Sequence, residues 1–247
     1  MTTVLLHGFL GGPASWDGVV TALPSSERVL RPTLMGHGRG DSGDASGTFD
    51  EEVDRLACAL EKEHAGTVHL VGYSMGARVA LVLALRHPRL VERLTLVSVL
   101  PGIADADERR VRARLDDALA AELVSNGLPA FVARWESLPL FESQRELPAE
   151  LRARHRAIRL AHDAALLARA LTVLTPGRMP VTTPRLGEIG ARTLLVAGSR
   201  DPKFVAAARS IEPLFVDAHV RILPDTGHDP TLEKPRELAS LITENAP

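Results

Sequence analysis

Short apolar runs alternate with stretches of helical length along most of this chain. The apolar runs are rich in Val, Leu and Ile, and they cover residues 4–6, 28–30, 68–71, 94–99, 193–197 and 220–223. Helical patterns lie between and after them, at residues 16–23, 49–64, 74–87, 205–215 and 231–244. Strands that alternate with crossover helices run parallel. The rhythm therefore predicts an α/β fold with a mostly parallel sheet of about six strands, flanked by helices.

The alternation stops between residues 101 and 184. Seven prolines divide this stretch, and patterns at residues 109–123 and 150–174 predict helices, whereas no segment predicts a strand. We therefore expect a single domain over residues 1–247, with residues 101–184 inserted as a helical lid over one edge of the sheet.

Composition excludes several classes of protein. The 247 residues are 45% hydrophobic with a formal net charge of −2, which opposes a nucleic-acid partner because phosphate binding needs a basic face. The single cysteine, Cys58, excludes an intramolecular disulfide, and the opening residues lack the pattern of a signal peptide. No apolar run approaches the ~20 residues that span a bilayer. We expect a cytoplasmic protein without a membrane partner.

The strongest local motif is the G-x-S-x-G sequence of residues 72–76. It follows the apolar run 68–71 directly and precedes a helical pattern, which is the context of a strand-to-helix turn that exposes a nucleophile. The turn would present Ser74 at the carboxyl edge of the sheet. The alternative is a helix-capping serine between two structural glycines.

A nucleophilic serine needs a histidine and an acid. His228 follows the last predicted strand, and Asp201 follows the strand before it, so both belong to the same edge of the sheet as Ser74. We predict a Ser74, Asp201 and His228 triad, with Asp225 and Asp229 as alternative acids.

Two backbone N–H groups should bind a developing negative charge beside the serine. The sequence His7-Gly8-Phe9 follows the first strand, so we expect the N–H groups of Phe9 and Met75 to form this oxyanion hole. His7 and His37 are expected to be structural. The remaining histidines outside the triad that we assessed, His64, His69, His87 and His219, are expected at the surface or beside strands. No spacing indicates a metal site or a phosphate-binding loop, so no cofactor is expected.

These motifs, with Gly36-His37-Gly38, resemble the α/β-hydrolase superfamily across essentially the whole chain. A narrower resemblance is to the family of 2-succinyl-6-hydroxy-2,4-cyclohexadiene-1-carboxylate synthases of menaquinone biosynthesis. It is carried by Arg78, four residues after the serine, by Trp135 in the insertion, and by Lys203-Phe204 after the acid. The superfamily usually has eight strands, including an antiparallel hairpin at one edge of the sheet. The pattern of this chain predicts about six strands and no such hairpin.

The resemblance implies a lyase that removes pyruvate from 2-succinyl-5-enolpyruvyl-6-hydroxy-3-cyclohexene-1-carboxylate, with the triad serving proton abstraction. Its substrate is a small tricarboxylate, and arginine suits carboxylates because its guanidinium binds them in a fork. Positions that match the family imply Arg78, Arg112 and Arg159 as carboxylate ligands, with Tyr73 and Trp135 lining the pocket.

Two clusters of four arginines lie in the insertion, and Arg156 competes with Arg159 for the role. The alternative is that most of these arginines form surface ion pairs at helical spacing with Asp105, Asp107, Asp116 and Asp117.

Two other functions use the same residues. A carboxylesterase or related serine hydrolase would employ the same triad on an ester carbonyl, and a ligand-binding protein could use the same fold without catalysis. Enclosed arginines favour the lyase, because a neutral ester pocket needs no guanidinium. We expect a monomer or weak homo-oligomer.

Overall fold

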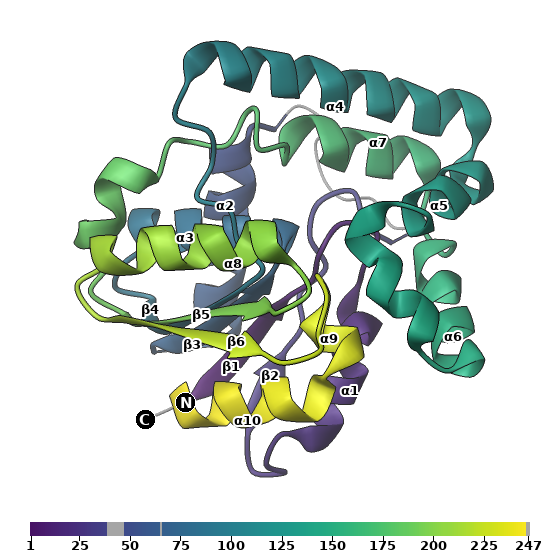
Figure 1. Cartoon of the computed structure of the whole chain (residues 1–247). Helices are drawn as coiled ribbons and strands as arrows, with labels where there is room; N and C mark the ends of the chain where they lie inside the picture. Colours follow the sequence, from purple (N-terminus) through teal and green to yellow (C-terminus); the bar gives the residue numbers. More distant parts are fainter. Residues whose placement is uncertain (39–46, 65, 246–247) are drawn as a thin grey trace.

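Six parallel strands form one sheet in the computed structural model, which describes residues 1–38, 47–64 and 66–245 (Figure 1). The spatial order is β2-β1-β3-β4-β5-β6. Their bounds are β1 Thr2–Leu6, β2 Arg28–Leu30, β3 Val68–Tyr73, β4 Val91–Val97, β5 Arg192–Gly198 and β6 Ala218–Leu223. This confirms the predicted α/β class and strand number. Residues 39–46, 65 and 246–247 of the predicted domain lie outside the described residues.

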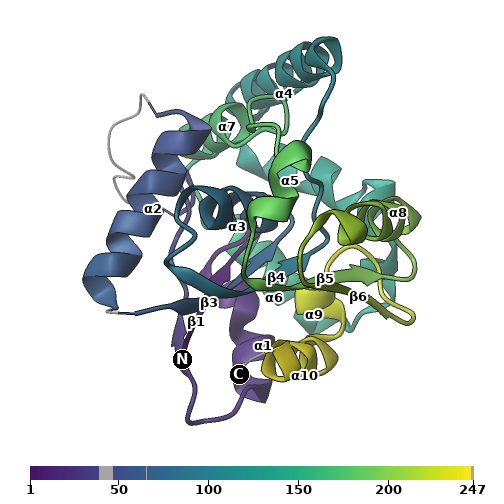
Figure 2. The ribbon, with the colours of Figure 1, turned by 90° about the vertical axis from the view of Figure 1, so that its left-hand side faces the viewer.

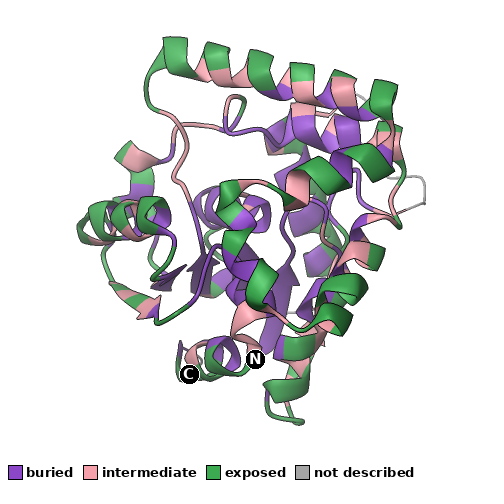
Figure 3. Cartoon of the chain, turned by 45° about the vertical axis from the view of Figure 1, so that its right-hand side comes forward, coloured by how far each residue is buried: buried purple, intermediate pink, exposed green. Residues whose placement is uncertain are grey.

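Helices cover both faces of the sheet (Figures 1 and 2). On one face lie α2 (Phe49–Glu63), α3 (Met75–Arg86) and α8 (Pro202–Ile211); on the other lie α1 (Asp17–Ala22) and α10 (Pro235–Asn245). Side chains alternate between the faces, so Val4 and Leu6 join the core beneath α3, whereas Leu5 joins the core beside α1 and α10. The central strands β1 and β3 are buried on both faces, as strands of parallel sheets are, whereas the edge strands β2 and β6 are partly exposed (Figure 3).

The segment 101–184 is helical and contains no strand. It comprises α4 (Ala106–Asn126), α5 (Leu128–Glu136), the 3-10 helix Pro139–Glu146, α6 (Ala149–Arg159) and α7 (Ala164–Val173), and a further 3-10 helix begins at Thr183. Its helices α4 and α7 pack side by side (Figure 1). A separate apolar cluster that includes Leu123, Phe131 and Leu167 also contains Leu10 from the loop after β1. The segment is thereby attached to the edge where the strands end.

Several predicted helix bounds were wrong. The pattern at 150–174 is two helices, because the Asp163 side chain accepts hydrogen bonds from the N–H groups of Ala165 and Leu166 (both 2.9 Å) and starts α7. The pattern at 231–244 is divided into α9 (Pro230–Glu233) and α10, since a residue before proline avoids helical geometry and Lys234 has φ −141° and ψ 55°. The 205–215 helix begins earlier, at Pro202, and ends in a 3-10 turn, Glu212–Leu214. The helix predicted at 16–23 is a 3-10 helix, Pro13–Trp16, followed by α1.

Two glycines allow α3 to start against the sheet. A Cβ on Gly72 would lie 2.4 Å from the carbonyl oxygen of Gly76, and one on Gly76 would lie 2.3 Å from the carbonyl oxygen of Leu6. Both contacts are with backbone, which cannot move aside without shifting a strand or a helix.

Replacement of Gly76 by alanine should therefore destabilise the fold. In an open helix this change would stabilise by about 1 kcal/mol, but here overpacking should lower the free energy of unfolding by about 2 kcal/mol. Urea denaturation would measure it. Gly190→Ala is the matched control, because nothing lies within 4 Å of its Cβ position; equal stability of the two variants would contradict the close-packing argument.

Candidate active site

Ser74 occupies a strained turn between β3 and α3. Its backbone has φ +52° and ψ −107°, a conformation that side-chain-bearing residues rarely adopt. The Ser74 N–H donates to the carbonyl oxygen of Val97 at 2.9 Å, which ties the turn to the end of β4. The serine side chain therefore lies at the carboxyl edge of the sheet.

Asp201, His228 and Ser74 lie in one hydrogen-bonded row. His228 Nε2 is 3.1 Å from Ser74 Oγ, and His228 Nδ1 is 2.7 Å from Asp201 Oδ2. Asp201 and His228 are both buried, at 5% and 2% exposure. The alternative acids lie elsewhere, because Asp225 is exposed and Asp229 accepts a hydrogen bond from Thr231 Oγ1 at 2.6 Å. An acceptor, a base and a hydroxyl in this order can move a proton to and from the serine oxygen.

The loop that carries His228 is held by two side chains that sequence reasoning missed. Ser98 Oγ donates to the carbonyl oxygen of His228 at 2.8 Å. The Glu233 carboxylate accepts the N–H groups of both neighbours of the histidine, Gly227 at 2.6 Å and Asp229 at 3.2 Å. Burial raises the pKa of Glu233, although these hydrogen bonds oppose the rise. No sequence motif marks either residue, because both act through backbone groups.

The predicted oxyanion groups lie beside the serine. Met75 is the first residue of α3, so its N–H has no acceptor within the helix. Phe9 lines the same cavity as Ser74. The pairing of these two N–H groups around an oxyanion stays a prediction.

Three histidines accept hydrogen bonds from backbone N–H groups of the loops that follow β1 and β2. The N–H groups of Leu34, Leu10 and Gly38 donate to ring nitrogens of His7, His37 and His162, at 3.1, 3.2 and 2.8 Å respectively. Each ring can be an acceptor only while neutral, and burial lowers the pKa of His7 to about 4 and that of His37 well below its usual value. His7 and His37 are thus structural in the described loops. His69 is also buried, contrary to expectation, and its Nε2 is 2.8 Å from Thr95 Oγ1.

A cavity of about 190 Å³ opens onto Ser74 and His228. Of the residues predicted to contact substrate, Tyr73, Arg78, Arg112 and Trp135 line it. The ring of His228 is packed in it by Phe204, Tyr73 and Phe141, with ring centroids 4.4, 5.6 and 6.0 Å away. The imidazole ring of His228 is therefore in contact with three aromatic side chains.

Arg78 is the most unusual cation in this cavity. Its Nη1 is buried without a hydrogen-bond partner among the described residues. Removal from water, and secondarily the charge of Arg112, lower the pKa of Arg78 to about 9. Arg112 is half-exposed and bonds Asp116 through Nε at 2.7 Å, so it both forms the expected helical ion pair and lines the cavity. Arg78 remains available to an anion.

Arg159 does not line the cavity that contains Ser74. Its Nη1 bonds Glu136 Oε1 at 2.9 Å and its Nη2 bonds Gln144 Oε1 at 3.1 Å. It lines a smaller neighbouring cavity of about 30 Å³, together with Tyr73 and Trp135, which Arg156 does not reach. A role for Arg159 toward substrate stays a prediction, and it would require release from Glu136.

Other arginines in the insertion form surface pairs, as the alternative interpretation expected. Arg110 pairs with Asp107, but Asp117 pairs with Arg178 rather than with a clustered arginine, and Asp105 caps α4 by accepting the N–H of Glu108 at 2.8 Å. Within the described residues, no group of three or more His, Cys, Asp or Glu side chains is arranged to hold a metal ion. None of the helices in the same ranges is long and apolar enough to cross a membrane.

Comparison with known proteins assigns the chain to a family. The model of the alpha/beta hydrolase family matches residues 3–241. The chain belongs to the alpha/beta hydrolase family. Within this family, a Bacillus subtilis (strain 168) protein provisionally named 2-succinyl-6-hydroxy-2,4-cyclohexadiene-1-carboxylate synthase is 36% identical, over 98% of this chain and 88% of that protein.

Two further proteins are similar to this chain over nearly its whole length. The 2-succinyl-6-hydroxy-2,4-cyclohexadiene-1-carboxylate synthase of Escherichia coli O1:K1 / APEC is 31% identical, over 98% of this chain and 92% of the enzyme. The structure of MenH from S. aureus superposes with a TM-score of 0.94 at 35% identity, covering 99% of this chain and 92% of MenH.

The contacts of Glu233 predict that this carboxylate positions His228 in this member of the alpha/beta hydrolase family. Glu233→Ala should lower kcat of the enzyme by about tenfold or more, because the loop on both sides of His228 loses its acceptor. Glu233→Gln keeps one carbonyl acceptor and should recover part of that loss. Steady-state kinetics over a pH range would measure both, and equal kcat and pH profiles in the two variants and the wild type would contradict the role.

Proposed function

We propose that this chain is a 2-succinyl-6-hydroxy-2,4-cyclohexadiene-1-carboxylate synthase, a lyase that releases pyruvate from 2-succinyl-5-enolpyruvyl-6-hydroxy-3-cyclohexene-1-carboxylate. The named relatives support it at nearly full length. The single structural observation that carries it is Arg78, which lines the cavity that holds Ser74 and whose buried Nη1 has no hydrogen-bond partner among the described residues. A substrate with three carboxylates supplies the missing acceptor, whereas a neutral ester does not.

The triad geometry fits proton abstraction. In the proposed reaction His228 Nε2 takes the Ser74 proton, and Ser74 Oγ removes the ring proton next to the succinyl ketone. Electrons move through the ring double bond, two conjugated double bonds form, and the ring carbon–oxygen bond to enolpyruvate breaks. The abstracted proton is returned to the expelled enolpyruvate, which becomes pyruvate, so that no oxidant or reductant is needed.

The roles of the surrounding groups follow from where charge develops. Negative charge accumulates on the succinyl ketone oxygen during proton removal, and the N–H groups of Phe9 and Met75 are proposed to donate hydrogen bonds to that oxygen. Asp201 would keep the proton on Nδ1 of His228 and stabilise the imidazolium. Arg78 and Arg112 would bind carboxylates, with Tyr73 and Trp135 as walls. Arg159 would join them after leaving Glu136.

The helical segment 101–184 is proposed to act as a lid within a single domain, because its residues Arg112, Trp135 and Phe141 form one side of the cavity. We propose a cytoplasmic enzyme whose partner is the small tricarboxylate, without nucleic acid or membrane, acting as a monomer or weak homo-oligomer.

The decisive experiment supplies the purified protein with the enolpyruvyl substrate. We expect accelerated release of pyruvate, followed by a coupled dehydrogenase, together with absorbance of the conjugated diene. Ser74→Ala should remove nearly all of the activity, with a loss on the order of 10⁴-fold or more in kcat. Good turnover of p-nitrophenyl esters with no accelerated pyruvate release would instead identify a serine hydrolase with the same triad.

Arg78→Met should lower the activity of the enzyme and raise the stability of its fold. The kcat/KM for the tricarboxylate should fall about 10- to 100-fold, because a hydrogen bond to a charged group contributes about 1.5–3 kcal/mol. The free energy of unfolding should rise by about 1 kcal/mol, since a cation is removed whose buried Nη1 has no partner among the described residues. Arg86→Met on the same helix is the control, because Arg86 pairs at the surface with Asp54 and its loss should leave kcat/KM unchanged. A wild-type kcat/KM in Arg78→Met would exclude Arg78 from substrate binding.

A further inference from the structure

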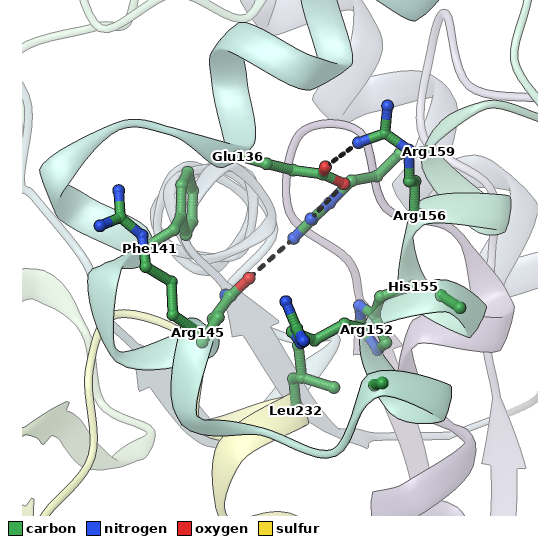
Figure 4. Close-up of a pocket in the computed structure, with 11 residues that line it drawn as sticks. Glu136, Phe141, Arg145, Arg152, His155, Arg156, Arg159 and Leu232 are labelled. Atoms are coloured by element: carbon green, nitrogen blue, oxygen red, sulfur yellow. Dashed lines mark hydrogen bonds and ion pairs between the residues drawn. The ribbon is translucent and has the colours of Figure 1, made fainter.

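A larger cavity of about 310 Å³ lies outside the candidate active site (Figure 4). It is bordered by α6, by the 3-10 helix Pro139–Glu146 and by Leu232 of α9. None of Ser74, Asp201 and His228 lines it. Phe141 borders both this cavity and the one that contains Ser74, so one aromatic ring stands between the two.

The lining of this cavity is cationic. It includes four arginines and a single carboxylate, that of Glu136, which Arg156 and Arg159 share. Figure 4 shows these two side chains converging on Glu136, with Arg152 directed into the same space and Arg145 extending toward Phe141. Arg152 donates through Nε to the carbonyl oxygen of Leu147 at 3.2 Å, and within the described residues it has no ion pair with a carboxylate. The positive charge of the cavity therefore exceeds its negative charge.

A buried amide in the same lining lacks an acceptor. Gln144 is 7% exposed, and its Oε1 accepts a hydrogen bond from Arg159 Nη2. Its Nε2 is buried and has no hydrogen-bond partner among the described residues. An unsatisfied buried donor costs about 1–3 kcal/mol, so this N–H group beside guanidinium groups indicates an anionic ligand that is able to accept it.

We propose that this cavity is a second binding site for a small organic carboxylate, separate from the site at Ser74. Arg152 provides a guanidinium that has no carboxylate partner among the described residues, and Gln144, which lines the same cavity, provides an N–H donor without an acceptor. A carboxylate accepts hydrogen bonds from both kinds of donor. Apolar atoms of Phe141, Ala149 and Leu232 complete the lining. A carboxylate with a short apolar end fits both parts of the site.

Pyruvate is the carboxylate that we assign to it, and this choice rests on the proposed function. The elimination releases pyruvate in the cavity that contains Ser74, and Phe141 borders both that cavity and this one. Arg159 borders both this cavity and the small one beside Tyr73. The site would hold the product after it leaves Ser74. Binding of pyruvate requires no turnover, so its failure and a failure of the lyase assay can be distinguished.

Calorimetric titration of the full-length protein with pyruvate at low ionic strength tests the proposal. Saturable binding is expected, and Arg152→Gln and Gln144→Leu should each weaken it by about tenfold. Arg154→Gln is the matched control, because Arg154 lies on the same helix but pairs with Asp17 outside the cavity; its Kd should equal that of the wild type. Arg152 is exposed, so its variant decides the matter even if Gln144→Leu fails to fold.

Three outcomes would overturn the proposal. The first is no saturable binding of pyruvate by the wild type. The second is a Kd that changes in Arg78→Met but not in Arg152→Gln, which would place the ligand beside Ser74. The third is inorganic phosphate binding as tightly as pyruvate, which would indicate a general anion site without preference for carboxylates.

Discussion

The contact between the start of α3 and the end of β1 is the constraint on which the candidate active site depends. With hydrogens at positions 72 and 76, the helix approaches the strands closely enough for Ser74 to take its left-handed conformation. Parallel strands all end at one edge, so residues that follow β5 and β6 reach the same place from far along the chain. The hydrogen-bonded row of Ser74, His228 and Asp201 is therefore a product of sheet topology as much as of local sequence.

Side chains that stabilise the fold differ in kind from side chains that can bind a ligand at the carboxyl edge of the sheet. The sheet core consists mainly of Val, Leu and Ala with almost no exposure. Burial lowers the pKa of His69 in β3 to about 4, so its ring is neutral, and its Nε2 lies 2.8 Å from Thr95 Oγ1. The cavities beside the sheet core hold Arg78 and Gln144, whose buried nitrogens have no partner among the described residues. Such groups reduce the free energy of unfolding and are retained where a ligand supplies the acceptor. The unsatisfied nitrogens of Arg78 and Gln144 thus belong to the two cavities that we propose as binding sites.

Sequence alone predicted the features that depend on chain order. Apolar periodicity located all six strands, and the strand ends located Ser74, Asp201 and His228. It could not predict features that depend on contacts between distant segments: the burial of His69 against Thr95, the hold of Glu233 on the His228 loop, or the bonding of Arg159 to Glu136 and Gln144. The break at Asp163 was also missed: Asp is a favoured N-cap residue, but an apolar helical pattern continues on both sides of it and hides the boundary.

The strand order has a consequence for the order in which the protein acquires its properties during synthesis. Strands β3, β4, β5 and β6 are neighbours in the sheet in the same order in which they leave the ribosome. A nascent chain that has paired β1 to β4 already contains Ser74 but neither its base nor its acid. The hydroxyl is chemically inert until the final strands dock, so proton-transfer activity reports the completion of folding rather than its beginning.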